Sequence, residues 1–257
     1  MIKFFRRIRK SLLEQDKMGK YFKYAIGEIL LVVIGILIAL QINNWNENRK
    51  DRIIEKKILS EVLLDLQINR GDLEDMIKIA EERLKKVEEI NEHIIRRKPE
   101  YDSLGFELRE ASSTLQFTPR TIGNESLKAK GVDIIQNELV RNSIVRVYGY
   151  SFHNLIMEGR EYEQFDNPTI DLLPYLKKHL VVDPTTTGDI SAKNINYKFE
   201  TYGLKIKDYK ALLDDSEFLL MLQKSMFNRA NKIIMSKRLI KEMIRVEGYI
   251  SEELAKR

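Results

Sequence analysis

The sequence has no cysteine among its 257 residues, which excludes a disulfide framework and the cysteine-based zinc and iron–sulfur sites. Its only histidines, His93, His153 and His179, have no partner at metal-binding spacing, so we expect no metal site. Five prolines and 12 glycines are too few for a collagen-like or low-complexity chain. The lack of cysteine fits extracytoplasmic and cytosolic proteins alike and does not decide the compartment.

Signatures of catalysis and cofactor binding are also missing. The scattered glycines form neither a P-loop nor a dinucleotide fingerprint. The segment from Gly149 to His153 partly matches a nucleophile elbow around Ser151, but its final glycine is replaced and no strand precedes it. Acidic pairs such as Glu81-Glu82 fit solvated helix faces or caps better than a catalytic carboxylate pair. We therefore expect a protein that is not an enzyme, with no catalytic residue and no cofactor.

Basic residues are concentrated at the N-terminus. Residues 1–24 carry eight Lys or Arg and two acidic side chains, a charge of +6, which leaves −1 for residues 25–257. A nucleic-acid-binding protein would carry its basic surface on the folded part, so we expect no nucleic-acid partner. The first residues could also form a weakly amphipathic basic helix on an anionic leaflet, or serve only to set topology.

A long apolar run occupies residues 25–42, with Glu28 as its one charged side chain. Its eighteen residues give about 27 Å of helix, close to the thickness of a bilayer core. Aromatic side chains flank the run and predict interface anchors at Tyr24 and Trp45. A buried core helix would rarely be apolar on every face. A cleavable signal peptide would need a small-x-small pair after the run, where Ala39 stands alone.

These features predict three parts: a basic cytoplasmic segment 1–23, a transmembrane helix 24–42, and a helical domain 43–257 on the far side. Eight Lys or Arg precede the apolar run, against five in the twenty residues after it. The positive-inside rule then places the N-terminus in the cytoplasm and the C-terminal domain in the periplasm of a bacterial inner-membrane protein with a single span.

One face of the expected membrane helix carries Glu28, Gly35 and Ala39. Gly35 and Ala39 form a small-x-x-x-small pair that permits close approach of a second helix. A carboxylate within an apolar span costs free energy unless it lies near the headgroups or makes a contact. Two interpretations therefore stay open: a helix–helix contact in the membrane, or an interfacial Glu28 on a simple anchor.

The rest of the chain shows helical periodicity. Between Glu47 and Ile95 the pattern predicts either one long helix or a helix with a break near Gly71. Another begins after residues 214–217, where Asp214 and Glu217 resemble a capping box, and runs to the end. The apolar columns of the two, counted by sevens, are Leu59, Leu66, Leu73, Ala80, Val87 and Ile94, and Leu219, Met226, Ile233, Ile240 and Leu254. A second column on the first helix is Val62, Asn69, Met76, Arg83 and Ile90.

The expected fold class is all-α: a single N-terminal transmembrane helix followed by a bundle in which the first and last long helices pack antiparallel. Shorter helices are expected over 103–116, 124–131, 137–159 and 172–180, with a proline-containing loop at 117–123. Residues 195–207 are the one segment where a short extended piece is expected.

Three stretches resemble a family of uncharacterised bacterial membrane proteins common in Bacteroidota. They read FFRRIRKSLL, YAIGEILLVVIGILIALQINNWNENRK and ESLKAKGVDIIQNELVRNSIVRVYGY. The resemblance implies a single-span protein with a helical C-terminal domain and implies no activity. In the third stretch the similar positions include Leu127, Gly131, Asn137 and Tyr148, of which Gly131 and Asn137 are expected to be turn and cap residues.

The expected function is that of a membrane-anchored, non-enzymatic interaction or assembly module. Its partners would be membrane lipids and either a second copy of the chain or another membrane or periplasmic protein. The alternative is a ligand-sensing periplasmic domain, which would need a polar pocket between helices, for example near Arg141, Arg146, Tyr148 and Tyr150.

Overall fold

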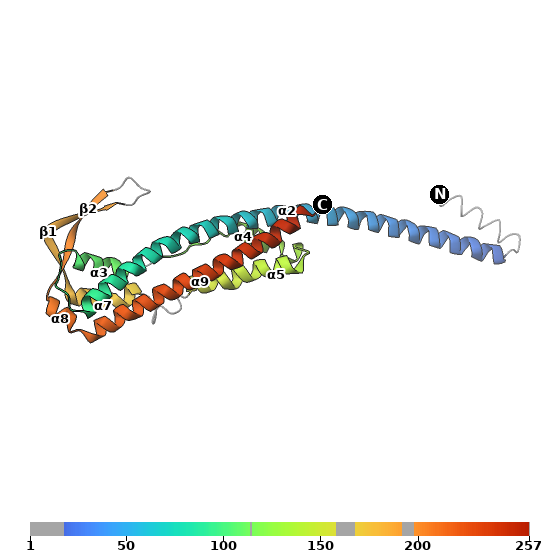
Figure 1. Ribbon diagram of the computed structural model, residues 1–257. Helices are drawn as coiled ribbons and strands as arrows, with labels where there is room; N and C mark the ends of the chain where they lie inside the picture. Colours follow the sequence, from blue (N-terminus) through green and yellow to red (C-terminus); the bar gives the residue numbers. More distant parts are fainter. Residues whose placement is uncertain (1–17, 114, 158–167, 192–197, 257) are drawn as a thin grey trace. The chain divides into compact units, whose positions relative to one another are not determined.

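The computed structural model describes residues 18–113, 115–157, 168–191 and 198–256 (Figure 1). Helices dominate, as the expected all-α class requires. In chain order the elements are α2 (Met18–Ile95), α3 (Leu104–Ser112), α4 (Ile122–Lys130), the 3-10 turn η1 (Val132–Ile134), α5 (Glu138–Arg146), the π-helical turn η2 (Val147–Ser151), α6 (Phe152–Met157), α7 (Pro168–His179), β1 (Leu180–Ser191), β2 (Lys198–Ile206), α8 (Tyr209–Leu213) and α9 (Ser216–Ala255).

The chain forms two compact units. The first ends at Lys57 and, among the described residues, consists of the N-terminal part of α2. The second runs from Ile58 to Arg257 and contains all the other elements. The expected segment boundaries after residues 23 and 42 refer to a bilayer and stay predictions. The basic segment 1–23 lies mostly outside the described residues.

Within the second unit, α2 and α9 lie side by side and antiparallel (Figure 1), as the two apolar columns predicted. Helix α2 continues through Gly71 without a break, so of the two alternatives the single long helix is confirmed. Polar pairs link the two helices in opposite sequence order: Arg70 with Glu247, Glu81 with Lys237, and Asn91 with Gln223.

The apolar column of α2 faces the core. Five of its six members, Leu59, Leu66, Leu73, Val87 and Ile94, are buried, and Ala80 is partly exposed. The α9 column is correct only at its centre, where Ile233 is buried, because Leu219, Met226, Ile240 and Leu254 are partly exposed.

The core-facing column of α9 lies on a neighbouring line of the helix. Its members, seven residues apart, are Leu222, Arg229, Ser236, Met243 and Ile250. Two polar members, Arg229 and Ser236, conceal this column from a count of apolar residues. The inner face of α9 was therefore assigned to the wrong column.

A hydrophobic core closes the end of the second unit where α2 ends and α9 begins. Its buried members come from α2, α3, α7, α8, α9 and the hairpin: Val87, Ile90, Ile94, Leu104, Leu108, Ala111, Leu172, Leu176, Leu180, Ile206, Leu212, Phe218 and Leu222. Helix α3 packs closely against β2 at Gly105. A Cβ at this position would lie 2.5 Å from the carbonyl oxygen of Leu204 and would clash with it.

Strands β1 and β2 form an antiparallel hairpin that the sequence showed only in part. Strand β2 falls inside the extended piece expected over 195–207, whereas β1 was not expected. The pairing runs from Leu180 opposite Ile206 to Ser191 opposite Lys198, with an irregularity between Asp183 and Thr187. Pro184 lies in that irregularity, where its missing N–H costs no ladder hydrogen bond.

Several helix ends differ from the expected ones. The N-cap of α9 is Asp215, whose side chain accepts from the backbone N–H of Phe218, and not Asp214. Asp214 instead ends α8 and pairs with Arg97 at 2.7 Å. Gly131 has φ 91° after α4, the left-handed region that favours glycine, and Asn137 caps α5 as expected.

Candidate functional site

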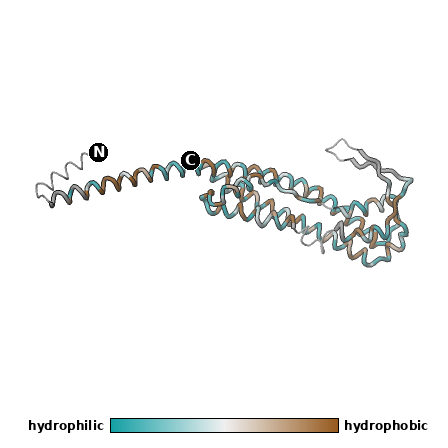
Figure 2. Tube along the Cα trace, turned by 180° about the vertical axis from the view of Figure 1, so that it is seen from behind, coloured by the Kyte–Doolittle hydropathy of each residue, from teal (hydrophilic) through white to brown (hydrophobic). Residues whose placement is uncertain are grey.

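The apolar side chains of the predicted membrane segment are exposed wherever the structure describes them. The large apolar side chains from Ile26 to Ile42 have exposed fractions of 44–63%. Figure 2 shows this stretch of α2 as a predominantly hydrophobic run. By length and composition it is the one described helix able to cross a membrane. Some signal sequences near an N-terminus have the same length and hydropathy, so that α2 crosses a membrane stays a prediction.

The residues predicted for a membrane contact share a helix in the first unit. Gly35 and Ala39 are exposed and Glu28 is partly exposed. A Cβ on Gly35 would meet no other heavy atom within 4 Å, so its face is open to a second helix. Trp45 is 66% exposed, and the guanidinium of Arg49 lies 5.9 Å from its ring centroid. The Tyr24 side chain lies outside what the structure describes.

A buried polar cluster in the second unit joins α2 to the loop before α4. Asp65, only 1% exposed, accepts from the backbone N–H of Gly123 at 2.6 Å and from Nε of Arg120 at 2.8 Å. One turn later Asn69 is fully buried. Its Nδ2 donates to the carbonyl oxygen of Arg120 at 2.9 Å, and its Oδ1 accepts from the Arg120 N–H at 2.7 Å. Two side chains of α2, Asp65 and Asn69, therefore hold residues 120–123 against this helix.

Gly123 brings the first turn of α4 directly onto the α2 backbone. A Cβ at this position would lie 2.4 Å from the nitrogen of Val62 and 2.6 Å from the carbonyl carbon of Glu61. No side chain fits there. The sequence analysis placed Gly123 only at the end of a loop. Its close approach to a helix some sixty residues earlier could not be predicted, because such a contact leaves no pattern in the neighbouring residues.

Tyr148 extends this cluster with an unusual hydroxyl group. Its hydroxyl oxygen is buried and has no hydrogen-bond partner within the described part of the chain. Burial raises the pKa of Tyr148, and the negative charge of Asp65 raises it further, so the phenol stays protonated. The residue lies in the π-helical turn η2, and its ring meets Phe152 edge-on at 5.0 Å.

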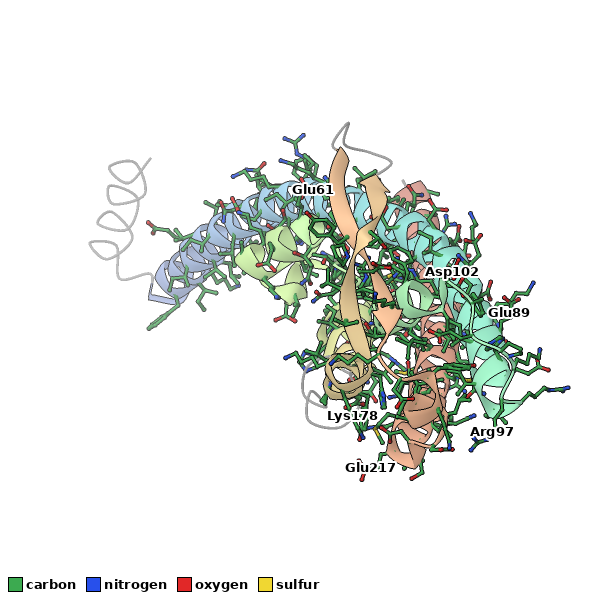
Figure 3. All side chains as sticks on the ribbon, turned by 90° about the vertical axis from the view of Figure 1, so that its left-hand side faces the viewer. Glu61, Glu89, Arg97, Asp102, Lys178 and Glu217 are labelled. Carbon is green, nitrogen blue, oxygen red and sulfur yellow. The ribbon has the colours of Figure 1, made fainter. Side chains whose placement is uncertain are left out.

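A second polar cluster fixes the junction between α7 and α9. Asp215 accepts from His179 at 2.7 Å and from Nζ of Lys178 at 2.8 Å. Burial alone would raise the pKa of Asp215, but these hydrogen bonds and the Phe218 N–H outweigh it and hold the pKa well below its usual range. Figure 3 labels Lys178 on α7 and Glu217 in the first turn of α9, at the same end of the unit. The cluster caps helix α9.

The residues proposed for a ligand-sensing pocket do not converge. Arg141 donates to the carbonyl oxygen of Ile135 at 3.1 Å, and Arg146 pairs with Glu242 at 3.2 Å. Tyr148 points into the α2 cluster described above, and Tyr150 is exposed. Arg146 alone of the four lines an open groove on α5, with Glu138, Leu139, Asn142 and Ser143.

The arrangement of polar groups favours structural roles over catalysis. Ser151 donates to Glu242 at 2.7 Å from within a π-helical turn, not from a strand-to-helix elbow. In the described ranges, no three His, Asp or Glu side chains converge as a metal site would require. The absence of enzymatic activity stays a prediction.

Comparison with known proteins identifies a family to which the chain is similar. The model of a family described as a family of unknown function (DUF6090) matches residues 28–170, more than half of the chain. The matched range begins at Glu28 and includes Asp65, Gly123 and Tyr148, but not α9. No curated protein and no solved structure matches the chain.

Proposed function

The chain belongs to the DUF6090 family of unknown function, and from its architecture we propose that it is a membrane-anchored, non-enzymatic helical module that binds a second copy of itself or a partner protein outside the cytoplasm. The observation that carries this proposal is the contrast between two parts of α2. The apolar stripe from Leu59 to Ile94 is largely buried within the second unit, whereas no described residue covers the large apolar side chains of residues 26–42.

An aqueous setting would make this exposed stretch costly. Full burial of one Leu, Ile or Val side chain is worth about 1.5–3 kcal/mol, and twelve such side chains between Ile26 and Ile42 are exposed. A bilayer removes that surface from water, and a helix satisfies its own backbone hydrogen bonds there. Exposed Trp45 with the neighbouring Arg49 suits the headgroup region at the end of the span.

The proposed orientation puts the N-terminus in the cytoplasm and residues 43–257 in the periplasm. The excess of Lys and Arg before the span supports it. The test is protease treatment of spheroplasts that express the full chain with a C-terminal epitope. Digestion of the domain in intact spheroplasts is expected. Protection until the membrane is lysed would show the opposite orientation.

The proposed contact surface in the membrane is the face of Glu28, Gly35 and Ala39. The open space at Gly35 supports it, since a second helix could approach the backbone closely there. We expect Glu28→Leu and, independently, Gly35→Leu to weaken association while insertion and the folding of the second unit persist. A simple anchor would instead tolerate Glu28→Leu, which makes the span more apolar.

The assay is crosslinking in membranes through a single cysteine introduced at Asn46, next to Trp45, because the chain has no cysteine of its own. Ile36→Leu is the matched control, as it changes an exposed side chain of the same helix away from the Gly35–Ala39 pair. Reduced crosslinking in Glu28→Leu and Gly35→Leu but not in Ile36→Leu is expected. Equal crosslinking in all variants would indicate that the span serves only as an anchor, and any partner binding would then be expected in the second unit.

A further inference from the structure

Two arginines occupy core-facing positions in the middle of the α2–α9 pair. Arg83 takes the place of an apolar residue in the column Val62, Asn69, Met76, Arg83 and Ile90 of α2. Arg229 does the same in the column of α9 that includes buried Leu222 and Met243. Both side chains are partly buried. An apolar residue of similar length would fill either position without the cost of removing a charge from water.

The two guanidinium groups meet at Ser113, just after α3. Nη1 of Arg83 donates to Oγ of Ser113 at 3.2 Å, and Nη2 of Arg229 donates to the carbonyl oxygen of the same residue at 2.8 Å. Arg229 also donates to the carbonyl oxygen of Ala111, and Nζ of Lys232 donates to that of Leu115 at 2.9 Å. Three cationic side chains therefore surround the C-terminal end of α3.

Among the residues that the structure describes, neither Arg83 nor Arg229 forms an ion pair with a carboxylate, in contrast to other partly buried cations of this unit. Arg70 pairs with Glu247 at 3.0 Å, and Lys224 pairs with Asp171 at 3.1 Å. Burial, and then the charge of Arg83, lower the pKa of Arg229 to about 10. The pair thus has a net positive charge that no carboxylate of the described residues neutralises.

Helix capping explains only part of this arrangement. The last carbonyl groups of α3 lack helical partners and accept from Arg229, as cations near a helix C-terminus commonly donate. A single capping arginine would suffice for that purpose. The second guanidinium adds like-charge repulsion at the same place, which a bound negative charge would relieve.

We propose that Arg83 and Arg229, with Ser113, form a binding site in the bundle for an oxyanion, the phosphate or carboxylate group of a small molecule. Helix bundles commonly build ligand sites from facing side chains in their core. Guanidinium groups suit both chemistries, because their planar N–H donors match two oxygens of one group. Such a site would supply what a ligand-sensing domain needs, at a place different from the Arg141–Tyr150 region.

The test is isothermal titration calorimetry on the full chain in mild detergent. Inorganic phosphate and succinate are the two probes, each at an ionic strength held constant with sodium chloride. Saturable binding of at least one probe is expected, and which probe binds identifies the oxyanion chemistry. Arg83→Gln should weaken that binding tenfold or more, because it removes one charged donor while leaving the Arg229 contacts to α3 in place.

Arg238→Gln is the matched control, since it removes the same charge from an exposed position of α9 and should bind like wild type. Arg83→Lys keeps the charge but loses the planar donors, and an intermediate affinity is expected. Circular dichroism verifies folding of each variant, and Arg83→Lys serves as the deciding variant if Arg83→Gln does not fold. The absence of saturable binding by both probes, or equal affinity in the Arg83 variants and wild type, would overturn the proposal. The outcome is independent of membrane topology and self-association, so it can fail or succeed separately from the proposed function.

Discussion

Replacing Gly123 by alanine adds one methyl group at the closest approach between α4 and α2. The new Cβ would lie 2.4 Å from the nitrogen of Val62, 2.6 Å from the carbonyl carbon of Glu61 and 2.7 Å from the Cα of Val62. These are backbone atoms of a long helix and cannot rotate away as a side-chain end could. The first turn of α4 must therefore move outward.

The expected cost combines two effects. Overpacking of a well-packed contact typically costs about 1–3 kcal/mol. Outward movement also lengthens the 2.6 Å hydrogen bond from the Gly123 N–H to buried Asp65, and a hydrogen bond to a charged group contributes about 1.5–3 kcal/mol. Because relaxation will relieve some of the contact and weaken only part of the bond, we expect Gly123→Ala to lower the free energy of unfolding by about 2–4 kcal/mol.

Urea unfolding of the full chain in mild detergent, followed by circular dichroism at the helical band, measures this change. The control is Gly248→Ala in α9, where a Cβ would meet no atom within 4 Å. At that exposed helical position alanine should stabilise the protein by about 0.5–1 kcal/mol through its better helix propensity.

The two glycine variants are thus expected to shift the unfolding midpoint in opposite directions. A midpoint for Gly123→Ala equal to that of wild type, with Gly248→Ala behaving as stated, would refute the close approach of α4 to α2. It would also remove the support for Asp65 as the acceptor that holds the loop.

Three further changes test other parts of the second unit. Leu73→Asp, at a fully buried position of α2, should cost several kcal/mol, whereas Leu220→Asp on the exposed face of α9 should change stability by about 0.5 kcal/mol or less; similar urea midpoints would contradict the assigned core. Asp215→Asn should make the free energy of unfolding depend less on pH at acid pH. The pKa of Asp215 is lowered in the folded protein, so the stability that its carboxylate contributes is present above about pH 4 and is lost as the pH falls. An unchanged slope between pH 5 and 2 in urea titrations would contradict that role. Asn69→Ala should cost about 1–3 kcal/mol, because it leaves the Arg120 N–H and carbonyl group without their partner; no change in the midpoint would refute it.

Local patterns predicted the helices well because a helix repeats its environment every few residues. The column of α2 from Leu59 to Ile94 is continuous and apolar, and its burial followed directly. On α9 the count of apolar residues at sevens predicted the wrong inner face, because the core-facing column contains the polar residues Arg229 and Ser236. Hydrophobic periodicity cannot identify an inner face at positions where polar residues occupy it.

The hairpin and the cap of α9 show a second limit. Strand β1 contains Pro184 and three threonines, a composition typical of a loop, and it is a strand because β2 pairs with it and its first residue, Leu180, packs into the core. Asp214 and Asp215 are equally good N-caps in sequence. Contacts with Lys178 and His179 select Asp215, while Arg97 engages Asp214.

The sequence by itself determined that this chain is helical and carries a bilayer-length apolar run, because both properties depend on the order of neighbouring residues alone. Only the tertiary structure decided which polar groups meet. Asp65 and Gly123 are 58 residues apart, and Arg83 and Arg229 come from different helices. Their proximity depends on how α2, α4 and α9 pack, and no local pattern encodes the distance between side chains so far apart in the chain.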